Sequence, residues 1–332
     1  MVAAVKVPSL LLVWLGLVAL GLTGCPRQPA GDAALRKVVF QSDWFAQAEH
    51  GGFYQALAKG YYREAGLDVD ILTGGPGAGI KLKVAKGEAD FGMNRGDDAI
   101  LAVSRGLPLM MVMATLQHDP QALLLHADDP VKDFPDLNGR TVTAAVGMTW
   151  IPYIQQKYGI KFGLVPTSYG LASFLVDRSV IQQCFLTSEP YFARQKGVAV
   201  RVLPLTATGY DIYHAVICRR ELLRKEPEIV RAFVAASIRG WQDYITNDPA
   251  PAHQLILARN RDMTAGQLAF SRQALIEHAL VSGHAERGEA TGRLNLERIQ
   301  QEIDRLLEFG VLEKALRADA VATTAYLPVE SK

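Results

Sequence analysis

Cysteine is scarce in this sequence, and the spacings that bind metals are missing from it. The 332 residues include three cysteines, Cys25, Cys184 and Cys218, and contain no CxxC pair and no His-x-x-x-His spacing. A structural or catalytic metal is therefore not expected. Cys184 and Cys218 each lie in an apolar run, which favours two buried free thiols, although an oxidising compartment would allow them to pair.

An excess of one charge and a recognisable catalytic motif are also missing. The formal net charge is +1, which leaves no basic surplus for a nucleic-acid backbone. No serine sits in GxSxG, and none of the seven histidines has a neighbouring motif that gives it a catalytic role. The composition therefore favours a protein that is not an enzyme, and no cofactor is expected.

One long hydrophobic run is present, near the amino terminus. Residues 7–22 are apolar, follow Lys6 and lead into Thr23-Gly24-Cys25. This order is typical of an export signal and resembles the bacterial lipoprotein lipobox, so residues 1–25 are expected to be a signal peptide with Cys25 as the lipidated residue. Residues 26–35 would be a tether. A transmembrane anchor is the alternative, but the run is shorter than the roughly twenty residues that a spanning helix needs.

The stretch from residue 38 to residue 72 predicts a strand, a polar loop, an amphipathic helix and a second strand. In an α/β domain a strand-to-helix loop opens at the carboxyl edge of the sheet, where ligands bind. This loop carries Trp44, Glu49 and His50, and Tyr54 starts the helix. The alternative is that Trp44 packs on the domain and His50 is a satisfied surface residue.

The same alternation of strand, loop and helix continues along the chain, which indicates an α/β fold, and the length favours two lobes. Polar or aromatic residues recur on the predicted loops: Asn94, Asp97, Trp150, Glu189 and Tyr213. Asp98 is predicted to be the N-cap of the following helix. Because all of these loops belong to the same strand-loop-helix pattern, we expect them to lie around one cleft.

These loops are rich in aromatic and acidic side chains and poor in basic ones. Aromatic faces stack on planar rings, and carboxylates accept hydrogen bonds from ring N–H or amino groups. A sulfonate, nitrate or phosphate would need Arg or Lys in the cleft, and Arg95 is the one candidate. A flat, nitrogen-rich ligand is therefore predicted, in a receptor that closes on it.

Several short segments resemble one known family. Residues 43–44 (DW), 49–54 (EHGGFY), 58–62 (AKGYY) and 64–69 (EAGLDV) are similar to the opening of the thiamine-pyrimidine-precursor family, and residues 87–92, 137–140 and 189–190 continue the likeness. This family comprises ABC-importer receptors for formylaminopyrimidine or hydroxymethylpyrimidine and the related fungal pyrimidine synthase. Similar receptors bind riboflavin-like, sulfonate or other solutes.

The resemblance implies an α/β fold of periplasmic-binding-protein type II with two lobes around a ligand cleft. Residues 36–125 would form the first lobe and 126–216 the second, and residues 217–332 would return to the first lobe as carboxyl-terminal helices. It also implies an extracytoplasmic monomer that passes a small heterocycle to an ABC permease and its ATPase. With the lipobox, this gives a lipid-anchored solute receptor.

The roles of individual residues follow from loop placement and this likeness. Stacking is expected of Trp44, Tyr54 and Trp150, hydrogen bonding of Glu49, Asp97 and Glu189, and orientation of the ligand of His50, with Asn94 and Tyr213 completing the set. The fungal synthase binds pyridoxal phosphate through a lysine and consumes a histidine, and the matching positions look like Asn94 and Asp98. Alternatives are a receptor for riboflavin or another planar heterocycle, a synthase-like enzyme using His50, and a sensory domain.

Overall fold

Ten β-strands in the described part of the chain form two separate mixed sheets of five strands each. The computed structural model describes residues 1–4 and 34–328, so residues 5–25 of the expected signal peptide, with Cys25, and residues 26–33 of the expected tether lie outside it. The first sheet has the order β2-β1-β3-β10-β4. Its strands are β1 (Arg36–Gln41), β2 (Leu67–Leu72), β3 (Phe91–Arg95), β4 (Leu109–Leu116) and β10 (His214–Arg219).

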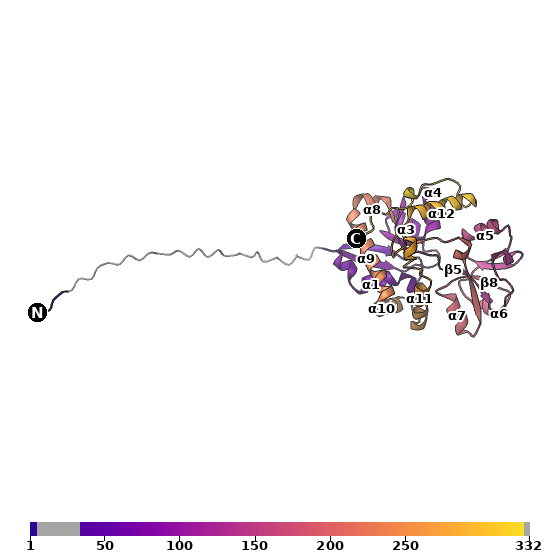
Figure 1. Ribbon diagram of the computed structural model, residues 1–332, viewed down its shortest axis with the longest axis horizontal. Coiled ribbons are helices and arrows are strands. Elements are labelled where there is room, and N and C mark those ends of the chain that lie inside the picture. The colour runs from indigo at the N-terminus through magenta and orange to yellow at the C-terminus, as the bar shows by residue number, and fades with distance from the viewer. Residues whose placement is uncertain (5–33, 329–332) are drawn as a thin grey trace. The chain divides into compact units, whose positions relative to one another are not determined.

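The second sheet has the order β7-β6-β8-β5-β9. Its strands are β5 (Gln121–His126), β6 (Thr141–Ala144), β7 (Gly163–Pro166), β8 (Ile181–Phe185) and β9 (Val200–Pro204). Strand β5 runs antiparallel to both β8 and β9, whereas β6 is parallel to β7 and β8. The two sheets give the two-lobed α/β architecture that the sequence predicted (Figure 1).

The chain passes between the lobes at two crossing segments. The first crossing, residues 117–120, joins β4 to β5, and the second, residues 205–213, joins β9 to β10. Lobe boundaries after residues 125 and 216 were expected, and the structure has both crossings earlier. The reason is strand pairing, because β5 is hydrogen-bonded on both sides within the second sheet and β10 lies between β3 and β4.

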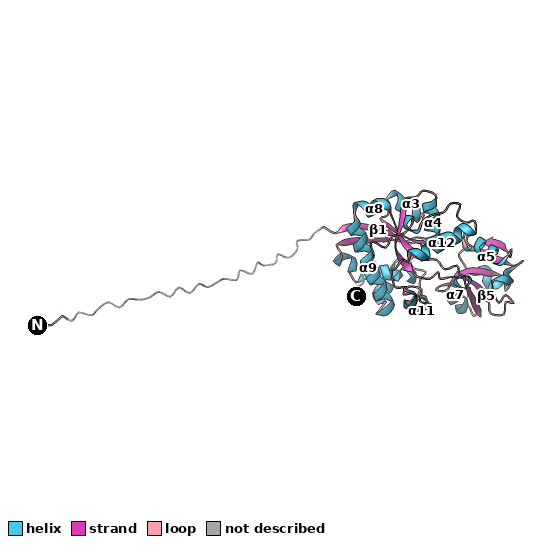
Figure 2. Ribbon diagram, turned by 45° about the horizontal axis from the view of Figure 1, so that its top comes forward, coloured by secondary structure: helices cyan, strands magenta, loops and turns pink. Residues whose placement is uncertain are grey.

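Two groups of helices cover the two faces of the first sheet (Figures 1 and 2). One face packs against α1, α2 and α9 around Phe40, Phe53 and Phe233, and the other against α3, α4 and α12 around Ile100 and Ile303. The first-lobe helices are α1 (Gly51–Ala58), α2 (Tyr61–Glu64), α3 (Ile80–Lys86), α4 (Gly96–Ser104), α8 (Arg220–Lys225), α9 (Pro227–Thr246), α10 (Ala250–Arg259), α11 (Ala265–Glu277) and α12 (Leu296–Glu308).

The pair Gly51-Gly52 fixes how the polar loop after β1 enters α1. A Cβ on Gly51 would lie 2.2 Å from the Tyr244 ring, and a Cβ on Gly52 would lie 2.1 Å from the Trp241 ring. Only hydrogen at these positions lets α1 pack this closely on α9. The short helix η1 (Ala48–His50) immediately before α1 is thereby held at the edge of the sheet.

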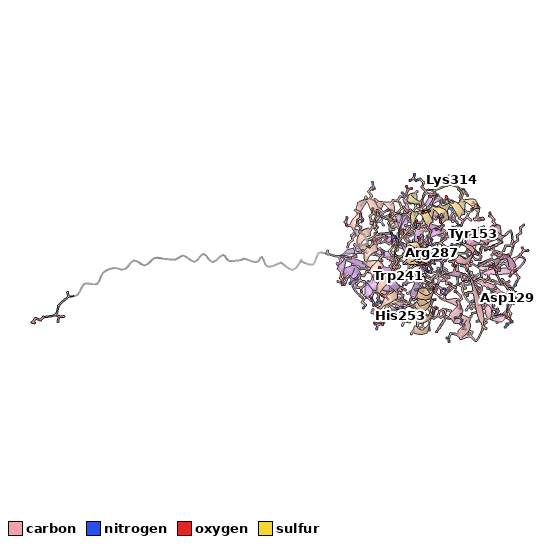
Figure 3. The ribbon with its side chains drawn as sticks, viewed as in Figure 1. Asp129, Tyr153, Trp241, His253, Arg287 and Lys314 are labelled. Atoms are coloured by element: carbon pink, nitrogen blue, oxygen red, sulfur yellow. The ribbon has the colours of Figure 1, made fainter. Side chains whose placement is uncertain are left out.

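The second lobe is smaller and has its own core. Its helices are α5 (Trp150–Tyr158), α6 (Ala172–Val176) and α7 (Glu189–Gln195). Tyr153 belongs to this core and Trp241 to that of the first lobe, as Figure 3 labels them. Cys184 in β8 and Cys218 in β10 are buried and free, as predicted, and they lie in different sheets.

The predicted helix from residue 53 to Gly66 is two helices instead. Gly60 lies between α1 and α2 with φ of 76°, a left-handed conformation that ends α1. Helix α4 begins at Gly96, three residues before the predicted start, so Asp97 and Asp98 occupy its first turn. Within residues 1–4 and 34–328, no helix is both long enough and apolar enough to span a membrane.

Candidate functional site

Loops from the two lobes meet directly at the edges of the two sheets. Thr187, after β8, donates its hydroxyl to Glu49 of η1, and Ser271 of α11 donates to the Thr187 carbonyl over 2.6 Å. The Trp44 ring lies 5.2 Å from the ring of Tyr169, which follows β7. These contacts join the first lobe to the second, so the lobes touch in this structure, and we call the boundary where these loops meet the crevice.

Two carboxyl groups lie where the lobes meet, Glu49 of the first lobe, which is buried, and Glu189 of the second, which is half-buried, and the charge of Glu49 acts on Glu189. Glu49 is 5% exposed, and Glu189 accepts a 2.7 Å hydrogen bond from the Phe185 amide. Burial raises the pKa of Glu189 to about 7, and the charge of Glu49 adds to that rise. Burial also raises the pKa of Glu49, against the opposing effect of the Thr187 hydroxyl. With a pKa of about 7, Glu189 can either donate or accept a hydrogen bond near neutral pH.

A line of histidines and aspartates runs from the β1 loop to the crossing segments. Asp43 Oδ1 lies 2.7 Å from His50 Nε2, and its Oδ2 lies 4.0 Å from His214 Nδ1. His214 Nε2 lies 3.5 Å from Asp119 Oδ1, and both ring nitrogens of His214 are buried without a hydrogen-bond partner. Burial opposes ionisation of Asp43, but the hydrogen bond from His50 lowers the Asp43 pKa overall.

Glutamines continue this line into the second lobe. Gln121 Nε2 donates to Asp119 Oδ2 over 3.0 Å, and Gln183 Nε2 donates to Gln121 Oε1 over 2.8 Å. Gln183 Oε1 in turn accepts from the Ala145 amide over 2.9 Å. These hydrogen bonds fix the orientation of both side-chain amides. Polar side chains held in this way need not reorganise when they bind a ligand.

The basic residue Arg95 is already neutralised. Asp97 is 0% exposed and accepts from Arg95 Nε over 3.2 Å and from the Tyr210 hydroxyl over 2.6 Å. Burial opposes ionisation of Asp97, but the charge of Arg95 and the hydroxyl of Thr149 lower its pKa overall. Arg95 Nε and Nη2 are thus bound to Asp97 and its Nη1 donates to the Met148 sulfur, so the charge of Arg95 is already paired.

Three of the nine predicted ligand residues contact the second lobe or the second crossing directly: Trp44 through Tyr169, Glu49 through Thr187, and Asp97 through Thr149 and Tyr210. Three others lie near them. The charge of Glu49 acts on Glu189, His50 is paired with Asp43 over 2.7 Å, and Asn94 donates to the Arg95 carbonyl over 3.3 Å.

The other three are core residues. Tyr54 and Trp150 are 0% exposed and Tyr213 is 1% exposed. Tyr54 packs in the first-lobe core, Trp150 packs on Phe162 in the second, and Tyr213 lies under Arg298. All three side chains face hydrophobic clusters in this structure, and a role for them in ligand binding stays a prediction.

Sequence reasoning missed several crevice residues. They are Asp43, Asp119, Gln121, Tyr169, Gln183, Phe185, Thr187 and His214. Glutamines inside otherwise apolar strands were an available signal, because a buried strand amide must find a polar partner. No local signal identified Asp119 or His214, which meet only because the two crossing segments lie together.

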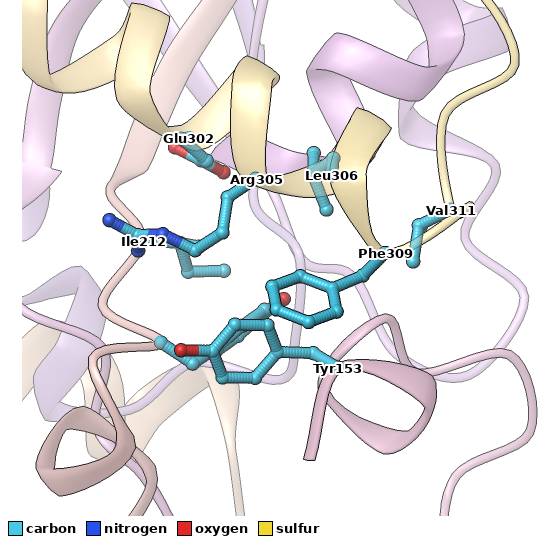
Figure 4. A pocket seen from close by; sticks show the side chains of 8 residues that line it. Tyr153, Ile212, Glu302, Arg305, Leu306, Phe309 and Val311 are labelled. Carbon is cyan, nitrogen blue, oxygen red and sulfur yellow. The ribbon is translucent and has the colours of Figure 1, made fainter. Parts of the chain in front are cut away.

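A small cleft between α12 and α5 is a separate feature (Figure 4). Its main contact is between the rings of Tyr153 and Phe309, whose centroids are 4.8 Å apart in an edge arrangement. None of the nine predicted ligand residues lines it. Among residues 1–4 and 34–328, no three His, Cys, Asp or Glu side chains are grouped so that they could hold a metal ion.

Comparison with known proteins agrees with this architecture. Residues 47–252 match the protein family described as NMT1/THI5 like. The riboflavin-binding protein RibY of Chloroflexus aurantiacus is 26% identical over 273 residues, which cover 75% of this chain and 74% of that protein. The formylaminopyrimidine-binding protein of Halalkalibacterium halodurans is 33% identical over 136 residues, which cover 40% of this chain and 41% of that protein.

An enzyme and a solved structure complete the comparison. A 4-amino-5-hydroxymethyl-2-methylpyrimidine phosphate synthase of Saccharomyces cerevisiae is 28% identical over 238 residues, 65% of this chain and 69% of the synthase. The periplasmic aliphatic sulphonate binding protein SsuA of Escherichia coli superposes with a TM-score of 0.65 at 16% identity, over 90% of this chain and 95% of that one. At this identity the superposition establishes the periplasmic-binding-protein fold alone.

Proposed function

Because the chain belongs to the NMT1/THI5-like family, we propose that it is the extracytoplasmic solute-binding component of an ABC importer. Its ligand would be a pyrimidine thiamine precursor, formylaminopyrimidine or hydroxymethylpyrimidine, which it would deliver to a permease. The proposal is supported by the two-lobed fold, by a relative that binds formylaminopyrimidine and by the acidic, aromatic crevice.

The observation that carries this proposal is the raised pKa of Glu189, to which the charge of Glu49 contributes, at the boundary where the Trp44 ring meets the Tyr169 ring. An aminopyrimidine presents an amino group, which donates, next to a ring nitrogen, which accepts. Glu189, which can carry a proton near neutral pH, and Glu49 would offer the complementary donor and acceptor. Trp44 and Tyr169, which touch each other in this structure, would stack on the flat ring once the lobes part to admit it.

An anionic solute suits this crevice less well. Asp43, Glu49, Asp119 and Glu189 give it acidic character, and Arg95 is bound to Asp97. A sulfonate or phosphate would be repelled by the carboxylates without gaining a free cation. The likeness to a sulphonate-binding structure therefore does not extend to the proposed ligand.

A riboflavin-like ligand is the second candidate, and the similarity to RibY favours it. An isoalloxazine ring would use the same stacking side chains, but it presents carbonyl acceptors next to a ring N–H. The two candidates differ in which protonation state of the carboxyl pair they prefer. Comparing the affinities for both ligands at about pH 6 and pH 8 would separate them.

A synthase activity is disfavoured by the residues at the positions that matter for it. Asn94 carries an amide, which cannot form the imine that holds pyridoxal phosphate, and it donates to a neighbouring carbonyl. Asp98 is paired with Lys81 over 3.2 Å. These side chains do not fit that cofactor, and we propose that the protein binds its ligand without converting it. Recovery of unchanged formylaminopyrimidine after incubation and denaturation would agree, whereas a new product would favour an enzyme.

The proposed location is the outer side of a membrane, with an acyl anchor on Cys25. Mass spectrometry of the protein extracted from membranes should find the chain beginning at Cys25 with added acyl mass. A Cys25→Ser variant should lose the acyl mass and leave the membrane fraction. If the variant remains membrane-bound, the anchor is elsewhere.

The decisive measurement is calorimetric titration of the full chain with formylaminopyrimidine, hydroxymethylpyrimidine and riboflavin. We expect a dissociation constant of about 1 μM for a pyrimidine, or about −8 kcal/mol. Glu189→Ala should weaken binding by about tenfold or more, because it removes the carboxyl group that would hydrogen-bond to the ring edge. Glu88→Ala, at a side chain that is 57% exposed, is the control and should bind as the wild type does. Equal affinity for wild type and Glu189→Ala would remove Glu189 from the site.

A further inference from the structure

A second group of ionisable side chains lies on the crossing segments, next to the crevice but outside it. His118, on the first crossing, has Nδ1 2.7 Å from Asp211 Oδ2 and Nε2 3.0 Å from Glu289 Oε2. Asp211 belongs to the second crossing, whereas Glu289 belongs to the segment between α11 and α12 in the first lobe. One imidazole therefore joins the two crossings to a third part of the chain.

If both acid partners are ionised, the two hydrogen bonds require a charged imidazole. A neutral histidine has one N–H, so only one of its two nitrogens can donate. Asp211 is ionised, because its hydrogen bond with His118 and the charge of Arg298 outweigh the opposing effect of burial and lower its pKa. With a carboxylate at each ring nitrogen, a neutral His118 would set a lone pair against a carboxylate oxygen. The imidazolium satisfies both partners.

Helix α12 and the segment before it hold both crossings by further hydrogen bonds. Arg298 Nη2 donates to the carbonyls of Gln117 over 2.6 Å and Asp211 over 3.2 Å. Gln117 Nε2 donates to the carbonyls of Ala290 and Arg293 over 2.7 Å and 2.8 Å. The crossings are thus tied to the first lobe over a short stretch, and any rotation of the second lobe must be absorbed at or beside these residues.

The surroundings of His118 add few other titrating groups. The ring of His284 lies 5.1 Å away, and that residue is also 3.7 Å from Glu286. Arg298 stays charged at all relevant pH values and lies 3.4 Å from Glu289 and 3.2 Å from Asp211. The Asp119 amide donates to Asp211 Oδ1 over 3.0 Å, a bond that does not depend on protonation of histidine.

We propose that charged His118 acts as a clamp on the two crossing segments, residues 117–120 and 205–213, which form the hinge between the lobes. While it is protonated, it fixes the two crossing segments against each other and against residues 280–298. Loss of the proton removes one of its two hydrogen bonds. The crossings are then held less tightly, and the lobes can move relative to each other. This rests on the proposed function only in assuming that the lobes move, and its test needs no ligand.

The test is hydrogen exchange of the full chain without ligand, followed at the backbone amides of residues 117–119 and 211–214. Protection is corrected for the intrinsic pH dependence of exchange. We expect it to fall by about tenfold between about pH 5.5 and pH 8.5, because a charge-assisted bond is lost at the hinge. Amides in the centre of β3 should keep their protection over the same range. Equal protection of the crossings at both pH values would overturn the proposal.

Three variants separate the clamp from a purely structural role. His118→Gln should show low protection of the crossings at both pH values. Glu289→Gln should show high protection at both, because the new amide can donate to neutral His118 as well as accept from its charged form. His284→Gln is the matched control and should retain the wild-type fall. If His118→Gln does not fold, Glu289→Gln decides alone, and a wild-type pH response in Glu289→Gln would overturn the proposal.

Discussion

Trp241 and Trp44 show how one residue type serves two different purposes in the same lobe. Trp241 is 0% exposed and packs 5.7 Å from Phe53 and 6.0 Å from Tyr244, both of the first lobe. Trp44 is partly exposed, and besides its neighbour Phe45 it meets Tyr169 of the second lobe. An aromatic ring enclosed within one lobe stabilises that lobe, whereas a ring shared between lobes can contribute to ligand binding and lobe closure.

The acidic residues repeat this contrast. Asp97 is buried with a full set of partners, including Arg95 and Tyr210, and its charge is stabilised. Glu189 is held by one backbone amide, and burial raises its pKa to about 7. A buried carboxylate with a complete set of donors is a structural element. One with an incomplete set is available for a ligand.

The largest effect that tests this contrast should come from Trp241→Ala. Removing a fully buried indole leaves a cavity, and we expect a loss of about 3–5 kcal/mol in the free energy of unfolding, measured by urea denaturation. Ligand affinity per folded molecule should stay the same, because Trp241 does not reach the crevice. A change in affinity without a loss of stability would reverse the roles assigned to the two tryptophans.

The next largest effect concerns stability against pH and Glu189. The pKa of Glu189 is raised to about 7 in the folded chain from the ordinary value of 4.5, so between these values the folded state binds more protons than the unfolded state. Stability should therefore fall as pH rises from about 4.5 to 7, by at most about 3 kcal/mol from this group. Thermal unfolding of Glu189→Gln should show a flatter profile. An identical profile in both proteins would contradict the raised pKa.

A smaller effect is expected for the contact between the lobes. Trp44→Ala and Tyr169→Ala should each weaken ligand binding by about fivefold to tenfold, or about 1 kcal/mol, with little change in stability. The double variant should lose less than the sum, because the two rings act on one ligand. Trp44→Phe, which retains a stacking face, is the control. Additive losses would mean that the rings act separately.

The smallest effect should come from exposed ion pairs. Arg178 and Asp128 form a pair on the surface of the second lobe with side chains that are 69% and 65% exposed. Arg178→Ala should change the free energy of unfolding by less than about 1 kcal/mol, and added salt should not enlarge the difference. This variant sets the baseline against which changes in the crevice are judged. A larger loss would show that the pair has an additional role.

Local patterns were enough to predict much of the first lobe. Strand β2 (Leu67–Leu72) ends at residue 72, where the sequence predicted the second strand to end, because alternation and glycine boundaries are properties of adjacent residues. The loop that carries Trp44, Glu49 and His50 was identified for the same reason. The family was identified from short motifs in this same region, and the match to residues 47–252 confirms it.

Other site residues could not be assigned from local patterns. Trp150 follows a strand and Tyr54 lies one turn into a helix, positions that also occur in ligand sites, yet both face hydrophobic cores. Which side of a helix faces its own lobe depends on the neighbours that pack there, and those neighbours are distant in sequence. Tyr169, Phe185 and His214 were missed for the complementary reason, since their partners lie in the other lobe or across the crossings.

The sequence by itself determined the α/β class, the first strand-loop-helix unit, the family and the acidic and aromatic character of the loops, because each depends on residues close together in the chain. Only the tertiary structure decided which of those side chains share the crevice, where the chain crosses between lobes, and that His118 meets Asp211 and Glu289. The physical reason is that burial, hydrogen bonding and charge pairing act over a few ångströms, and folding brings together residues that are 93 and 171 positions apart.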